Sequence, residues 1–103
     1  MKEQYKTLVR DYFYKGNDFV IVKGLHDGII RAVNYKYLDE NGLLTKQLNG
    51  AEMFVNTMNN TINGVMERIN SYYDWKEFVE ENNVNINDET ELLNAMKVFY
   101  KLA

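Results

Sequence analysis

Hydrophobic residues repeat near the start of the chain with the spacing of a helix, and then with the spacing of strands. Apolar side chains at i, i+3, i+4, i+7 and i+8 predict a helix over roughly residues 2–15, with Gly16 as its C-terminal stop. The short β-branched run at 19–22 predicts a strand. The apolar positions of the predicted helix are Tyr5, Leu8, Val9, Tyr12 and Phe13.

Two further strands follow, and each is preceded by a turn that contains glycine. His26-Asp27-Gly28 predicts the first turn, and residues 29–38 then alternate between apolar and polar side chains as a half-buried strand does. The sequence Asp-Glu-Asn-Gly at 39–42 predicts a hairpin turn, and 43–48 predicts the returning strand. Because the connections are short, we expect a three-stranded antiparallel meander.

The second half of the chain keeps helical spacing almost throughout. Asn49 followed by Glu52 has the form of a capping box and opens a helical pattern up to residue 69. Gly64 lies inside this pattern and lowers helix stability by about 1 kcal/mol relative to alanine. The next apolar stripe falls on a different side of a straight helix, so the pattern predicts a break or kink around residues 71–74.

Asn87 or Asp88 supplies a cap for one more helix, whose apolar residues again keep helical spacing. The predicted fold class is therefore α+β: an N-terminal helix, a three-stranded antiparallel meander and three C-terminal helices packed on one sheet face. The chain has 103 residues, is 46% hydrophobic and contains no proline-rich or low-complexity linker. This size and composition predict a single domain over residues 1–103.

Charge is distributed unevenly along the chain. The net charge is −3, but residues 74–91 contain seven carboxylates and one lysine, a local net charge of −6. Such a segment disfavours nucleic acid as its ligand and favours a basic protein. Helical projection places the aromatic residues of this segment on one side and most of the carboxylates on the other. The candidate partner-binding residues are Tyr73, Asp74, Glu77, Glu80, Glu81 and Asp88.

Structural roles compete with binding for several residues of this segment. Tyr72, Trp75 and Phe78 have the spacing of a buried stripe. Tyr73 faces outward among the carboxylates if the third helix begins before it, but it joins the preceding core stripe if the second helix extends through it. Asp88 is also stabilised as a solvated residue at the positive end of a helix dipole.

The sequence contains no recognisable catalytic, cofactor or metal site. The chain has one histidine, His26, placed in a turn and without a marked nucleophile, and it has no cysteine. The turn at 39–42 resembles the start of a calcium loop, but Leu43 and Leu44 follow where oxygen ligands would be needed. Isolated glycines form no phosphate-binding motif. We therefore expect a protein that is not an enzyme and that binds no cofactor.

The composition also bears on the origin of the protein. The chain has 14 asparagines, eight tyrosines, abundant lysine, no cysteine and no proline. In this it resembles small anti-defence proteins of phages and mobile elements, in particular type II anti-CRISPR proteins, which bind Cas9. The resemblance implies a compact acidic inhibitor that occupies a basic nucleic-acid-binding cleft. The N-terminal residues lack the apolar segment of a signal peptide, and we expect a location in the host cytoplasm, with no membrane attachment.

The leading hypothesis is thus a non-enzymatic inhibitor of a basic nucleic-acid-processing protein such as Cas9 with its guide RNA. A nucleic-acid-binding regulator is one alternative, although its basic side chains are spread out and interleaved with acids. A phage or plasmid assembly protein, with helices that pair between copies, is another. The basic residues of the first half are Lys2, Lys6, Arg10, Lys15, Lys23, Arg31, Lys36 and Lys46.

Overall fold

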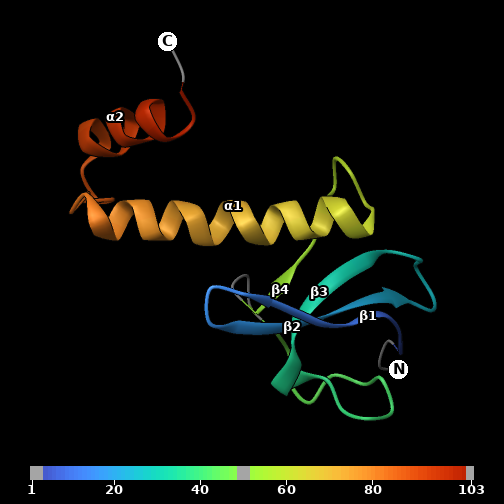
Figure 1. Ribbon diagram of the computed structural model, residues 1–103. Coiled ribbons are helices and arrows are strands. Elements are labelled where there is room, and N and C mark those ends of the chain that lie inside the picture. Colours follow the sequence, from blue (N-terminus) through green and yellow to red (C-terminus); the bar gives the residue numbers. More distant parts are fainter. Residues whose placement is uncertain (1–3, 49–51, 102–103) are drawn as a thin grey trace. The chain divides into compact units, whose positions relative to one another are not determined.

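The computed structural model describes residues 4–48 and 52–101 (Figure 1). These residues have an α+β fold with four strands in one antiparallel sheet and two α-helices. The chain divides into two compact units, Met1–Asn70 and Ser71–Ala103. The elements are β1 (Tyr5–Tyr14), β2 (Asn17–Gly24), β3 (Ile30–Asn34), the 3₁₀ turn η1 (Tyr35–Tyr37), β4 (Met53–Phe54), α1 (Ile62–Glu81) and α2 (Glu89–Phe99).

The predicted N-terminal helix is wrong, because these residues form the edge strand β1. β1 pairs with β2 through a two-residue turn at Lys15 and Gly16, where φ is 47° and 83°. Positive φ at both positions is the geometry of a type I′ hairpin turn. The register of β1 shifts twice, between Thr7 and Val9 and between Val9 and Tyr12. Each shift interrupts the two-residue alternation of a strand, and this is why the apolar spacing resembles that of a helix.

The predicted strand at 19–22 is confirmed as the centre of β2, and both of its faces are buried. On one face, Val20 and Val22 pack with Tyr5 and Val33. Partly buried apolar side chains pack against this cluster, namely Tyr37, Leu38, Leu44 and Leu48 from the chain after β3 and Met53 from β4.

The opposite face of the sheet carries Phe19, which packs edge-on against Phe54 with ring centroids 5.7 Å apart. Residues 62–70 of α1 lie over this face (Figure 1), and their Val65 and Ile69 are fully buried. The Tyr12 hydroxyl donates a 2.6 Å hydrogen bond to Oδ1 of Asn70. A continuous apolar strand suits this position because neither face of β2 meets water.

The turn between β2 and β3 is confirmed. Gly28 has φ +69°, and the Asp27 carboxylate accepts hydrogen bonds from the Ile29 amide and the Arg31 guanidinium. The strand predicted over 29–38 ends early, at Asn34, since the Asn34 side chain accepts from the Lys36 amide and begins η1. Side-chain hydrogen bonds of this kind compete with strand pairing.

The turn predicted at 39–42 is confirmed, since Gly42 has φ +79° and its amide donates to the Asp39 carbonyl at 3.1 Å. The returning strand predicted after it is wrong. The segment 43–48 makes only isolated bridges, from Leu43 to Gln4 and from Leu44 to Leu38, and the fourth strand comes instead from Met53–Phe54, which was predicted to be helical. The predicted cap Asn49 lies outside the described residues. Glu52 does not open a helix, because its carbonyl accepts from the Asn34 amide and extends the sheet.

α1 begins only at Ile62, after an asparagine-rich segment whose side chains bond the backbone. Asn56 Oδ1 accepts from the amides of Met58 and Asn59. Asn60 exchanges two hydrogen bonds with Ile30, which tie this segment to β3. Thr61 Oγ1 then accepts from the Gly64 amide, which is the N-cap bond of the helix. The helix start was therefore predicted about a dozen residues too early.

The predicted break at residues 71–74 is also wrong, and with it the count of three C-terminal helices. α1 runs without interruption from Ile62 to Glu81. Its first half buries Val65 and Ile69, whereas its second half carries Trp75 and Phe78 on another side. The change of apolar stripe, which predicted the break, reflects two halves of one helix that each bury a different face. Among the described residues, no helix is long and apolar enough to cross a membrane.

Candidate functional site

The unit Ser71–Ala103 contains a helical hairpin formed by residues 71–81 of α1 and by α2. Aromatic rings join the two helices. Trp75 lies 5.3 Å from Phe99 and 6.1 Å from Tyr100 between ring centroids, and Phe78 lies 5.3 Å from Phe99. The expected core positions Trp75 and Phe78 are thus partly buried in this contact. Ring contacts of this kind hold the hairpin together more strongly than exposed ion pairs.

The loop of the hairpin begins with a Schellman motif at the end of α1. The Val84 amide donates to the Val79 carbonyl at 3.0 Å, and the Asn83 amide donates to the Glu80 carbonyl at 3.3 Å. Asn83 has φ +50°, a left-handed conformation that asparagine tolerates better than most residues. The motif turns the chain sharply and brings Val84 back against the end of the helix.

The predicted cap at the start of α2 is confirmed for Asp88. Its Oδ1 accepts hydrogen bonds from the amides of Thr90 at 2.9 Å and Glu91 at 3.2 Å. Glu89 and Glu91 lie in the first turn, where negative charge is favoured by the helix dipole. Asp88 therefore has a structural role in addition to the predicted binding role.

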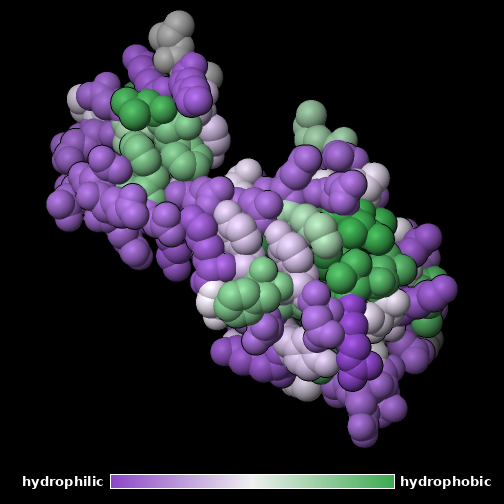
Figure 2. All heavy atoms as spheres, viewed as in Figure 1, coloured by the Kyte–Doolittle hydropathy of each residue, from purple (hydrophilic) through white to green (hydrophobic). Residues whose placement is uncertain are grey.

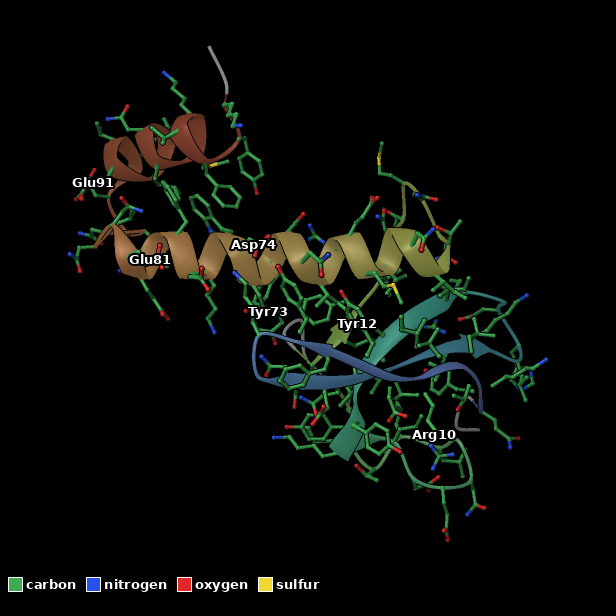
Figure 3. All side chains as sticks on the ribbon, viewed as in Figure 1. Arg10, Tyr12, Tyr73, Asp74, Glu81 and Glu91 are labelled. Atoms are coloured by element: carbon green, nitrogen blue, oxygen red, sulfur yellow. The ribbon has the colours of Figure 1, made fainter. Side chains whose placement is uncertain are left out.

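The carboxylates in residues 74–81 of α1 lie on adjoining parts of the helix surface. Asp74, Glu77 and Glu81 have the spacing i, i+3 and i+7 and form one stripe, which we call the acidic stripe. Asp74 is half-buried, and Glu77 and Glu81 are exposed. Glu80 is also exposed and follows Glu77 by three residues, so it lies beside the stripe. Figure 3 shows Asp74 and Glu81 projecting from α1 and Glu91 from α2.

Tyr73 is half-buried, and its ring packs edge-on against Tyr72 with centroids 5.0 Å apart. Burial, with a smaller contribution from Tyr72, raises the pKa of Tyr73 above 10.0. α1 extends through this position, and Tyr73 follows Ile69 by one turn on the same side of the helix. It is therefore not a fully outward ring at the centre of the acidic stripe.

A groove with a cavity of about 270 Å³ lies on the helical hairpin and was missing from the sequence prediction. Its apolar wall is formed by Phe78, Val84, Ala95 and Val98, and polar residues complete its edge. Figure 2 shows apolar side chains gathered between the two helices of the hairpin, with hydrophilic side chains around them. The polar residues at its edge are Asn82, Glu91 and Asn94.

One part of the groove has a signal in the sequence. The segment Glu81-Asn82-Asn83-Val84 is a helix end with asparagine at the left-handed position, followed by an apolar residue. Such a pattern predicts a Schellman motif and places the apolar residue against the last turn of the helix. Ala95 and Val98 carry no comparable signal, because their position depends on how α2 packs.

The unit Met1–Asn70 contains a second cavity, of about 340 Å³, beside β1. Val20 and Leu38 lie in its wall, and Arg10, Asp39 and Glu40 lie at its edge, so it mixes both signs of charge. Figure 3 shows Arg10 on this side of the sheet. Among residues 4–48 and 52–101, no group of three or more His, Cys, Asp or Glu could hold a metal ion.

Two basic residues of the first half are engaged within the protein. Arg31 pairs with Asp27, which lowers the pKa of the Asp27 carboxyl chiefly through the Arg31 hydrogen bond. Lys46 pairs with Glu52 at 2.7 Å, and this hydrogen bond raises the pKa of Lys46. These pairs leave a smaller basic surface for nucleic acid than the residue count suggests.

No family model, curated protein or solved structure matches this chain.

Proposed function

We propose that this protein is a non-enzymatic binding protein that inhibits a basic, nucleic-acid-processing partner in the cytoplasm of a host cell. The observation that carries the proposal is the acidic stripe together with Glu91, all within one helical hairpin. Carboxylates gathered in this way attract a basic surface and increase its rate of encounter. Cas9 with its guide RNA is the partner that the resemblance in composition suggests.

The hairpin suits this role because its aromatic contacts and its exposed carboxylates come from different residues. Trp75, Phe78 and Phe99 hold the helices together, whereas Glu77, Glu80 and Glu81 are exposed. The exposed carboxylates can therefore change without loss of the core. A matched set of exposed acids exists in the other unit, at Asp11, Asp18 and Glu40.

The test compares two triple charge reversals with the unchanged protein. In one variant Glu77, Glu80 and Glu81 become lysine, and in the control Asp11, Asp18 and Glu40 become lysine. Binding to Cas9 loaded with guide RNA is measured at low and at physiological salt, together with DNA cleavage. We expect the first variant to lose binding and inhibition and the control to keep both.

Two results would count against the proposal. Unchanged affinity of the first variant at low salt would show that the acidic helix face makes no contribution. Absence of binding by the unchanged protein would remove Cas9 as the partner. A gel-shift titration with DNA and RNA covers the nucleic-acid alternative, which requires salt-sensitive binding at micromolar protein.

A further inference from the structure

The groove of the helical hairpin offers apolar surface where a solvated helix would carry polar residues. Val98 is 68% exposed although it lies on the groove side of α2, and Phe78 and Val84 are only partly buried. At about 270 Å³ the cavity is smaller than the roughly 300–1,000 Å³ that small-molecule sites enclose. Its size suits one or two side chains of a protein partner.

The charges around the groove indicate the chemistry of this partner. Glu91 lies at its edge, and Glu81 follows Phe78 by three residues on the adjoining side of α1. Both lie toward the loop of the hairpin, as Figure 3 shows. The basic residues of α2 and its end, Lys97 and Lys101, lie farther along toward the C-terminus. At the end near the loop, the groove is therefore lined by apolar side chains and surrounded by carboxylates.

The edge of the groove also carries amide groups suited to a peptide. Asn94 lies on α2, one residue before the buried Ala95. Asn82 donates to the Phe78 carbonyl at 2.9 Å, and its own side-chain oxygen can accept from a ligand. An apolar groove binds the apolar face of an amphipathic helix, and the acidic surround favours a helix whose other face is basic.

We propose that this groove binds an apolar side chain from a basic amphipathic helix of the partner. The inference rests on the proposed function, because the same hairpin provides the acidic stripe. The stripe meets the lysines and arginines of the partner helix, and the groove takes a leucine or a similar side chain from its apolar face. The partner surface is then a helix with one basic and one apolar face, and a uniformly basic surface binds less tightly.

The experiment uses the full chain and three synthetic 18-residue peptides as probes. The first carries leucine at i, i+3, i+4 and i+7 and lysine on its other face. The second has the same composition in scrambled order, and the third replaces each leucine with glutamine. Affinity is measured by calorimetry at physiological salt, and amide NMR shifts locate the contact. We expect the patterned peptide to bind at least tenfold more tightly than the others.

Two single variants of α2 separate the groove from general apolar surface. Val98→Asp places a carboxylate in the groove and should weaken the patterned peptide at least tenfold. Leu93→Asp is the matched control, since Leu93 is 49% exposed on the same helix but does not line the groove. It should leave the affinity unchanged. Circular dichroism confirms that both variants keep their helices.

The possible failures are distinguishable. If the glutamine peptide binds as tightly as the leucine peptide, or if Val98→Asp has no effect, the groove inference is overturned while the acidic surface remains a binding site. If no peptide binds even at low salt, both the groove and the electrostatic basis of the proposed function are overturned.

Discussion

Replacing Gly64 with alanine tests how the start of α1 is built. In an ordinary helix this change stabilises the fold by about 1 kcal/mol, because alanine has the higher helix propensity. Here a Cβ on Gly64 would lie 2.0 Å from the carbonyl oxygen of Asn59. Real Cβ atoms essentially never come closer than 3.0 Å to such an atom, so the Asn59 backbone would have to move by at least the difference, 1.0 Å.

That movement disturbs a connected set of hydrogen bonds. The Asn59 carbonyl accepts from the Thr61 amide at 2.9 Å, and the Gly64 carbonyl accepts from Asn56 Nδ2 at 2.8 Å. Overpacking costs about 1–3 kcal/mol, and one weakened hydrogen bond costs about 1 kcal/mol more. After the gain in propensity is subtracted, we expect Gly64→Ala to lower the free energy of unfolding by about 2 kcal/mol.

Urea denaturation followed by circular dichroism measures this change. Asn63→Ala is the matched control, because Asn63 lies beside Gly64 in the same helical turn and is exposed. It should be neutral or slightly stabilising. If Gly64→Ala is as stable as the unchanged protein or more so, the close approach of Asn59 does not limit this position, and the reasoning fails.

Two further predictions concern residues of the candidate site. Asp88→Ala should lower the free energy of unfolding by about 1 kcal/mol through loss of the α2 cap, and Asp88→Ser should restore most of it; equal urea midpoints for all three proteins would contradict this. The pKa of Tyr73 is higher in the folded than in the unfolded protein, so folding is favoured while the hydroxyl stays protonated. This contribution to stability is complete below pH 10.0 and is lost as pH rises through the folded pKa. Tyr73→Phe should therefore show a shallower loss of stability above pH 10.0, and parallel stability curves from pH 8 to 11.5 would refute it.

The predictability of each element depended on how regularly it is built. β2 was predicted correctly because all four residues of 19–22 are buried between two covered faces, and this gives an uninterrupted apolar run. β1 was mistaken for a helix because its register shifts around Val9 disturb the alternation that identifies a strand. Gly28 was placed correctly in a turn, whereas Gly16 was predicted to end a helix and lies instead in the turn of a β-hairpin. A glycine does not tell whether a helix or a strand precedes it.

The helices show a second limit of local patterns. The spacing before Ile62 resembles a helix, yet the asparagine side chains of 56–60 bond the backbone and hold it in another conformation. The opposite error occurs within α1, where the change of apolar stripe predicts a break but the helix continues. A periodicity identifies the buried face of a segment, but only tertiary packing decides whether two successive faces belong to one helix.

The six candidate residues fall into groups that the sequence could only partly separate. The spacing i, i+3 and i+7 of Asp74, Glu77 and Glu81 is visible in the sequence, and the structure places all three on one helix. The capping bonds of Asp88 are predictable from its place before a helical pattern. For Tyr73 the sequence left two alternatives, and only the structure shows that its side chain is half-buried.

The acidic stripe and the groove would contribute to binding in different ways. Ion pairs formed by exposed carboxylates such as Glu77 and Glu81 contribute at most about 1 kcal/mol each and weaken as salt rises. They favour encounter with a basic surface but do not by themselves hold it. Apolar surface removed from water contributes about 25 cal/mol per Å², largely independent of moderate salt. Val98 and Phe78 can therefore supply the lasting affinity, and the carboxylates beside them restrict it to partners of positive charge.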